Sequence, residues 1–338
     1  TANIIGTGPF KFKSYTPGVT YELEKNPNYW DKDLPYLDGI VFYPMADPNV
    51  AAQALIAGQI HLNRGLGVPP LDLFEGYSDI RIVGVPTTLV WRLVLNGRQF
   101  EPFRDPRVRE AITLAIDRDA MLEIGTEGRG VISGWMHPDG AWPLPEERVR
   151  QARGKDKAAD IERAKQLLAE AGFPNGFDVE LLAFALGTPT TQSLVADQLG
   201  QIGIRVNVQN LQLSEYVQRV VAREFQMSLG FNAPWVDEPK STFASWITKD
   251  EQASLTGLWS DELIELYQQI DRELDLQRRK ELTNELDFRS LDAPAFGMIY
   301  LYRPLIWHIY RPSVLAGWTP QPNYNLTEKH ATTWLRSD

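Results

Sequence analysis

Residues 178–208 read DVELLAFALGTPTTQSLVADQLGQIGIRVNV and decide the fold class. Their pattern predicts a strand at 178–184, a helix at 190–202 and a second strand at 204–208. A strand, a helix and a second strand in this order indicate a parallel pair of strands joined by a crossover helix. The chain is therefore expected to have an α/β fold, with mixed sheets and flanking helices.

The first ninety residues read mostly as strands and turns. Residues 9–13 and 19–24 alternate apolar and polar side chains on either side of Pro17 and Gly18, which predicts a hairpin. A third apolar run at 40–44 predicts another strand.

Most of the remaining chain alternates helices with strands. Asp105 is expected to cap a helix that has Pro106 at its first position. Residues 125–157 are expected to be rich in loops, because glycines and prolines interrupt them. Other helices are predicted at 50–57, 161–171, 214–222 and twice within 261–291, and other strands at 80–85, 89–96, 226–231 and 295–309.

The length of 338 residues exceeds one ordinary compact core and indicates two lobes. No flexible Gly/Ser linker is found, so strands near Asn96 and Tyr300 are expected to pass between the lobes. The prediction is a partial first lobe at 1–96, a second lobe inserted at 97–300, and a return to the first lobe at 301–338. Two connecting segments of this kind would form a hinge.

Composition excludes several classes of protein. The net charge of -10, from 44 acidic and 34 basic residues, opposes binding to nucleic acid. The lack of cysteine excludes disulfides and thiolate metal sites. No apolar run reaches the ~18 to 20 residues that span a bilayer, and the first residues lack the order of a signal peptide.

Motifs of common enzymes are absent from the sequence. It contains no phosphate-binding loop, no zinc-binding helix motif and no nucleophile elbow, and its four histidines are scattered. No metal, cofactor or catalytic residue is therefore predicted, and the chain is expected not to be an enzyme. The alternative is a secreted hydrolase of carbohydrate or peptide that uses the carboxylate pair Asp237 and Glu238.

Aromatic side chains near strand ends and in loops are the main signal for a binding site. Such side chains can form the wall of a pocket, because pockets are mostly apolar with a few polar groups. The predicted ligand-binding residues are Trp91, Asn96, Trp135, His137, Phe231, Asn232, Trp235 and Asp237.

Three motifs near the start of the chain resemble those of a known family. They are GTGPFKF at 6–12, LEKNPNYW at 23–30 and LPYLDGI at 34–40. In this order they are similar to the most recognisable stretch of family 5 extracellular solute-binding proteins, which are the dipeptide, oligopeptide and nickel receptors of ABC importers. ALIAGQI, FRDPRVREAI, AIDR, AKQLLAEAG and QLGQIGI follow in the family's order, at 54–60, 103–112, 115–118, 164–172 and 198–204.

The resemblance implies a bilobal periplasmic-binding-protein-like fold of type II, in the cluster with large lobes. It implies a monomer that captures a ligand between two lobes and delivers it to a membrane permease. Because the resemblance is to the C-terminal two-thirds of family members, the N-terminal part of the first lobe is expected to be missing. The expected location is periplasmic or extracellular, and a lipid anchor in a segment outside this chain is left open.

The resemblance leaves the ligand open. In peptide-binding members the corresponding loop reads like A-D-Y-x-x-P, with an Asp that pairs with the peptide amino group. Here residues 231–239 read FNAPWVDEP, with Pro234 at the position of that Asp and Asp237 further on. An amide, two aromatic rings and a carboxylate suit an oligosaccharide about as well as an oligopeptide. No cluster of histidines supports nickel.

Overall fold

The computed structural model describes residues 6–152, 156–184, 189–244, 246–250, 254–292, 295–321 and 330–336. The chain forms two compact units, unit 1 from residues 1–85 and 306–338 and unit 2 from residues 86–305. The chain therefore crosses between units twice, once after Val85 and once inside strand β11 (Met298–Tyr310). The sequence placed these crossings near Asn96 and Tyr300, and the assignment of ligand-binding lobes stays a prediction.

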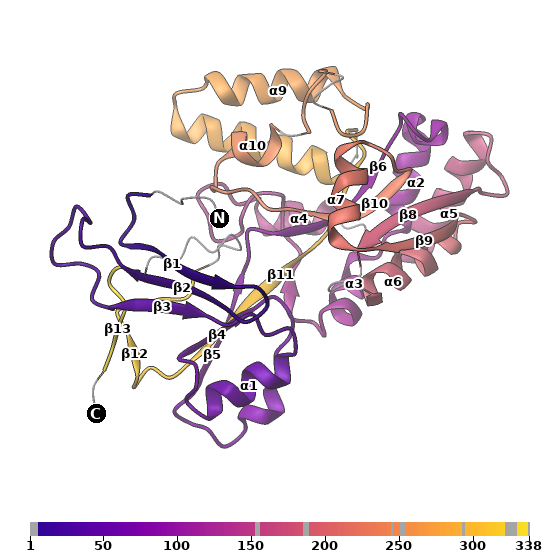
Figure 1. Ribbon diagram of the computed structural model, residues 1–338. Coiled ribbons are helices and arrows are strands. Elements are labelled where there is room, and N and C mark those ends of the chain that lie inside the picture. Colours follow the sequence, from indigo (N-terminus) through magenta and orange to yellow (C-terminus); the bar gives the residue numbers. More distant parts are fainter. Residues whose placement is uncertain are drawn as a thin grey trace. The chain divides into compact units, whose positions relative to one another are not determined.

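Unit 1 begins with an antiparallel sheet of β1 (Phe10–Thr16), β2 (Thr20–Lys25) and β3 (Gly39–Phe42), in that order (Figure 1). The predicted hairpin and third strand are confirmed. Lys11 on β1 is the register partner of Glu24 on β2, and their side chains form an ion pair across the two strands at 3.1 Å.

The core of unit 1 is built around α1 (Pro48–Ile56). Asp47 caps this helix by accepting a hydrogen bond from the Asn49 N–H at 2.8 Å. Leu55 packs in a buried cluster with Ala52, Phe74 and Ile309. Other elements of this unit are β4 (Leu62–Gly65), which pairs with the end of β11, the 3-10 helix Leu71–Phe74, β12 (Leu315–Ala316) and β13 (Trp334–Leu335).

Unit 2 contains the α/β part of the chain. Its strands follow the order β11, β6 (Val90–Leu95), β10 (Met227–Asn232), β8 (Asp178–Phe184) and β9 (Arg205–Leu211). β8 and β9 are parallel and α6 (Pro189–Gly200) connects them, so the predicted strand–helix–strand unit is confirmed. β10 is parallel to β8 and antiparallel to β6, which makes the sheet mixed. β5 (Arg81–Pro86), at the boundary of the units, and β7 (Gly130–Val131) pair with β11.

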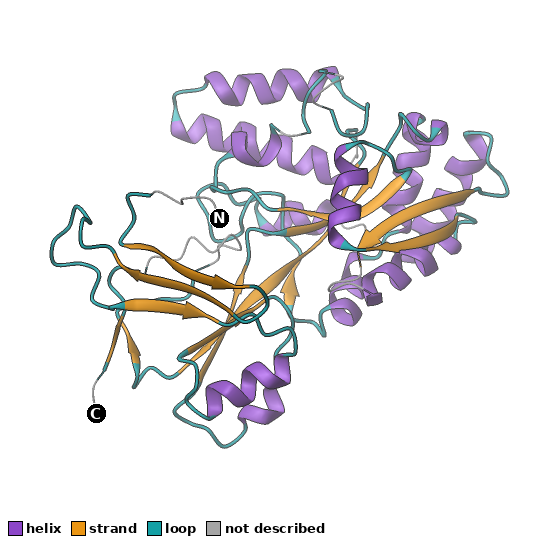
Figure 2. Cartoon of the chain, in the orientation of Figure 1, coloured by secondary structure: helices purple, strands orange, loops and turns teal. Residues whose placement is uncertain are grey.

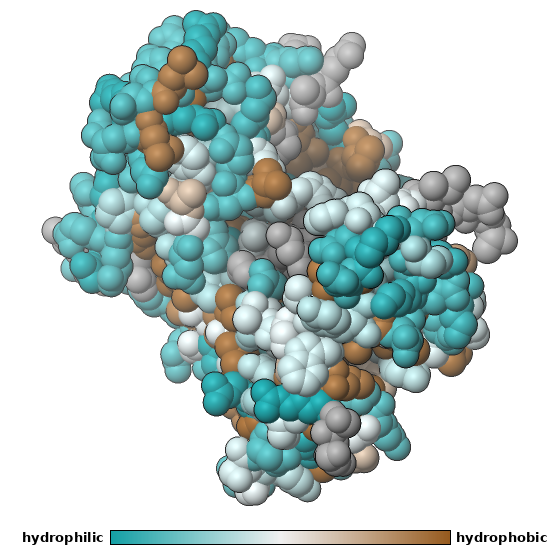
Figure 3. Space-filling view, turned by 90° about the vertical axis from the view of Figure 1, so that its left-hand side faces the viewer, coloured by the Kyte–Doolittle hydropathy of each residue, from teal (hydrophilic) through white to brown (hydrophobic). Residues whose placement is uncertain are grey.

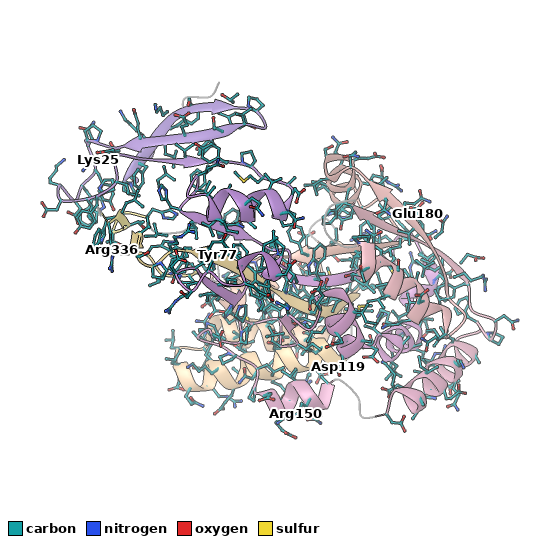
Figure 4. The ribbon with its side chains drawn as sticks, turned by 90° about the horizontal axis from the view of Figure 1, so that it is seen from below. Lys25, Tyr77, Asp119, Arg150, Glu180 and Arg336 are labelled. Carbon is teal, nitrogen blue, oxygen red and sulfur yellow. The ribbon has the colours of Figure 1, made fainter. Side chains whose placement is uncertain are left out.

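Helices gather in unit 2 (Figure 2). α2 begins after Asp105, which accepts a hydrogen bond from the Arg107 N–H at 2.9 Å, so the predicted cap is confirmed. α4 lies in the stretch that was expected to be rich in loops, and its Arg150 is labelled in Figure 4. The helices are α2 (Pro106–Ala115), α3 (Arg118–Gly125), α4 (Glu146–Ala152), α5 (Lys157–Glu170), α7 (Leu213–Val221), α8 (Pro239–Phe243), α9 (Asp261–Arg272) and α10 (Leu276–Asp292).

Hydrophilic residues prevail on the face shown in Figure 3, and apolar residues are scattered among them. None of the helices in the described parts of the chain is long and apolar enough to cross a membrane.

Candidate functional site

Two predicted site residues meet on adjacent strands of unit 2. Trp91 on β6 is the register partner of Phe231 on β10, so the two side chains share one face of the sheet. Their ring centroids lie 5.8 Å apart at 80°, and Phe184 at the end of β8 stacks on Trp91 at 5.8 Å and 25°. Phe184 also contacts the ring of Tyr216 on α7 at 5.0 Å. Two predicted ligand-binding residues thus belong to one aromatic cluster, and their role in ligand binding stays a prediction.

Asn96 lies directly after β6 and is fully buried. Its Nδ2 donates to the carbonyls of Arg223 and Phe225 at 3.0 and 2.9 Å, and its Oδ1 accepts from the Arg98 N–H at 3.0 Å. The amide thus ties the end of β6 to the turn before β10. These contacts give no support to its predicted role as a ligand residue.

Two buried charged groups hold the backbone of the loop that contains Trp135. The carboxylate of Asp287 on α10 accepts from the Trp135 N–H at 2.7 Å and from the Met136 N–H at 3.1 Å. Burial raises the pKa of Asp287 to about 6. The Arg303 guanidinium donates to the carbonyls of residues 87, 134, 135 and 136 and to the Ser133 hydroxyl, at 2.7 to 3.2 Å.

Trp135 itself belongs to the core. Only 1% of the residue is exposed, and its ring packs against Trp246 at 5.0 Å and Tyr300 at 5.6 Å. The ring therefore anchors the loop, and its predicted role in ligand binding stays a prediction.

His137 uses both nitrogens of its ring inside unit 2. Its Nδ1 accepts from the Asp139 N–H at 3.2 Å, which leaves the proton on Nε2 to donate to the Pro86 carbonyl at 2.9 Å. Burial lowers the pKa of His137, so the imidazole is neutral near pH 7. The ring joins the loop to the start of the unit.

Asp237, in the loop after β10, joins this loop to residues 141 and 142. Its Oδ2 accepts from the Ala141 N–H at 2.6 Å, and its carbonyl accepts from the Trp142 indole N–H at 3.1 Å. A Cβ at Gly140 would lie 2.1 Å from that Oδ2, so this contact requires glycine there. Trp235 in the same loop is 68% exposed.

The carboxylate pair of the hydrolase alternative is engaged elsewhere. Asp237 accepts the hydrogen bond from Ala141, and Glu238 forms an ion pair with Arg279 of α10. A pair of catalytic carboxylates acts on one bond from two sides, with one of them protonated. The contacts of both groups are those of loop anchors.

Sequence reasoning missed Arg92, which lies between Trp91 and Leu93 on β6. Its Nη1 is 2.7 Å from the Met298 sulfur, and its Nε is buried without a partner in the described parts of the chain. Burial lowers the pKa of Arg92 to about 10. The signal in the sequence was a charged residue inside the apolar run 89–95.

Groups of three or more His, Asp or Glu side chains that could hold a metal ion are not found among the residues with described positions.

Known proteins share this fold over almost the whole chain. The solved structure of the ABC transporter-associated periplasmic binding protein DppA from Helicobacter pylori, in complex with peptide STSA, is similar with a TM-score of 0.79 and 23% identity. That similarity covers 98% of this chain and 63% of DppA. AgaA from A. tumefaciens, in complex with agropinic acid, has a TM-score of 0.78 and 23% identity, over 98% of this chain and 67% of AgaA. The expected periplasmic-binding-protein fold is confirmed.

The sequence gives the family. Residues 1–254 match the bacterial extracellular solute-binding proteins, family 5 middle region, and the chain belongs to this family. A relative among curated proteins is the glutathione-binding protein GsiB of Pectobacterium atrosepticum, 28% identical over 256 residues. The match covers 72% of this chain and 48% of GsiB, so the chain spans about half the length of that relative.

Proposed function

We propose that this chain is the binding part of an extracytoplasmic receptor of an ABC importer and that it binds a peptide-like solute. The observation that carries the proposal is the family match over residues 1–254. Similar proteins are described with glutathione, the peptide STSA and agropinic acid. These compounds favour a peptide-like ligand over an oligosaccharide. Capture between two lobes, delivery to a permease and a monomeric, periplasmic or extracellular protein are parts of this proposal.

The architecture of unit 2 supports a binding role. Asp287, Arg303 and Asp237 fix loop backbone through hydrogen bonds at 2.6 to 3.2 Å, and the rings of Trp91, Phe184 and Phe231 pack together on the strands. Rigid loops beside aromatic rings reduce the entropy that is lost on binding.

Thermal unfolding with candidate ligands tests the proposal. The protein is heated with glutathione, the peptide STSA, a set of oligosaccharides or nickel chelates. A ligand at about 100 times its dissociation constant adds about 2.7 kcal/mol to the free energy of unfolding, which raises Tm measurably.

The outcomes distinguish the classes of ligand and of protein. A rise in Tm with the peptide or glutathione supports the proposal if mass spectrometry finds the compound unchanged after incubation. A rise with oligosaccharides alone would replace the ligand class, and Trp235→Ala then tests the exposed indole as a stacking surface. Cleavage products would favour the hydrolase alternative, and no rise with any compound would refute small-molecule binding.

A further inference from the structure

Arg92 lies in the middle of β6, opposite a glycine of the neighbouring strand. Its register partner on β10 is Gly230, so the two residues share a face. A Cβ at Gly230 would lie 2.3 Å from the hydroxyl of Tyr216, which places this hydroxyl on the same face. The surroundings of Arg92 there include this phenol, Gly230, the Met298 thioether and Tyr300, which is its register partner on β11.

Arg92 differs in its hydrogen bonds from Arg303 and Arg118, two buried arginines of unit 2. Arg303 donates to four carbonyls and one hydroxyl, and Arg118 donates to the carbonyls of residues 152, 291 and 300. In the described part of the chain, Arg92 reaches only the Met298 sulfur, which is a weak acceptor, and its Nε has none. A guanidinium with so few hydrogen-bond acceptors is costly to bury unless an anion binds it.

A second unpartnered donor lies on the same face. Asn232 is two residues beyond Gly230 on β10, and alternate residues of a strand point to the same side. Its Nδ2 is buried and lacks a partner among the described residues. Diagonal neighbours on adjacent strands are about 7–8 Å apart, so the side chains of Arg92 and Asn232 can reach one small group between them. Each residue is half-buried as a whole, whereas the Arg92 Nε and the Asn232 Nδ2 are themselves buried.

We propose that Arg92 and Asn232 bind a carboxylate of the solute, so that the ligands of this protein are acids. The planar guanidinium fork matches the two oxygens of a carboxylate, and the Asn232 amide supplies a further N–H. The proposal rests on the function proposed above and adds the charge of the ligand and the residues that recognise it.

The test combines a change in the ligand with a change in the protein. Calorimetry measures the affinity of the peptide STSA and of its C-terminal amide, and of glutathione and its diethyl ester, for the unsubstituted protein and for Arg92→Met. Blocking the carboxylate should weaken binding by about 10- to 100-fold in the unsubstituted protein and by less than about threefold in Arg92→Met. Arg163→Met, at an exposed position of α5, controls for the loss of one positive charge.

Two results would overturn the inference and leave the proposed function standing. One is equal affinity for the free and blocked compounds in the unsubstituted protein. The other is an equal effect of blocking in Arg92→Met, which would place the carboxylate elsewhere. Failure of all four compounds to bind the unsubstituted protein would instead refute the proposed function together with the inference.

Stability without ligand gives an independent readout. Because Arg92 has one weak acceptor, Arg92→Met should leave Tm unchanged or raise it. Arg303→Met removes a satisfied guanidinium and leaves four carbonyls without their donor, so it should lower Tm by about 10 °C. A similar loss in both variants would show that Arg92 serves the fold, and the inference would be wrong.

Discussion

Asp287→Asn is expected to change how the stability of unit 2 depends on pH. The carboxylate is fully buried and accepts two backbone N–H groups, from Trp135 and Met136. Burial raises the pKa of Asp287 from 3.8 to about 6, so the folded protein holds this proton more tightly than the unfolded chain. Asparagine has nearly the same shape and does not titrate, but its Nδ2 cannot accept the second of these N–H groups, which costs the variant the same amount at every pH.

The sign and size of the effect follow from this difference in pKa. Between pH 4 and pH 6 the folded state binds more protons at Asp287 than the unfolded state, so its contribution to stability falls as pH rises. The difference between a pKa of 3.8 in the unfolded chain and about 6 in the folded protein corresponds to about 3 kcal/mol in the free energy of unfolding. The free energy of unfolding of the variant minus that of the unsubstituted protein should therefore rise by about 2–3 kcal/mol from pH 4 to pH 7.

Urea unfolding followed by tryptophan fluorescence at pH 4, 5, 6 and 7 measures this difference. The contributions of the other titrating groups to the pH dependence cancel in this difference, because both proteins contain them. Asp197→Asn, at an exposed position of α6, controls for the loss of one negative charge. A difference in the free energy of unfolding that stays constant from pH 4 to pH 7 would refute the reasoning.

Three further predictions concern single side chains. Asn96→Ala removes three hydrogen bonds to backbone groups and should lower the free energy of unfolding by about 2–3 kcal/mol in a urea titration; an unchanged value would contradict the structural role. Gly140→Ala should displace Asp237 and lower both Tm and ligand affinity, whereas Gly67→Ala, where a Cβ meets no atom within 4 Å, should do neither. Leu55→Ala should cost unit 1 about 2–5 kcal/mol, seen as faster hydrogen exchange in α1; exchange rates equal to those of the unsubstituted protein would show that the cluster is not its core.

Local patterns predicted most of the elements. Alternation was enough for β1 and β2, and the pair Asp105 and Pro106 was enough for the start of α2, because these signals lie within a few residues. α4 was missed because Pro145 was interpreted as a breaker, although it directly precedes the first residue of the helix. Local sequence does not show which of these two roles a proline takes.

The site was harder to predict because its contacts join distant segments. Trp91 and Phe231 were predicted from their residue type and their expected places in or beside strands, and the register of β6 and β10 showed that they are neighbours. The partners of the Asn96 amide are 127 and 129 residues away, and Asp287 is 152 residues from Trp135. A sequence shows the donors but not the backbone groups that use them, so a structural amide and a ligand-binding amide look alike.

The passage of β11 from one unit to the other sets an order for folding during synthesis. Residues 86–305, which form unit 2, are complete while the last part of the chain is still to be made. Unit 1 has to wait, because Ile309 belongs to its core and Arg311 donates to the carbonyls of Leu55 and Ile56 at the end of α1. Domains usually fold in order from the N-terminus as the chain emerges. Here residues 1–85 are made before unit 2 but belong to the unit that is completed after it.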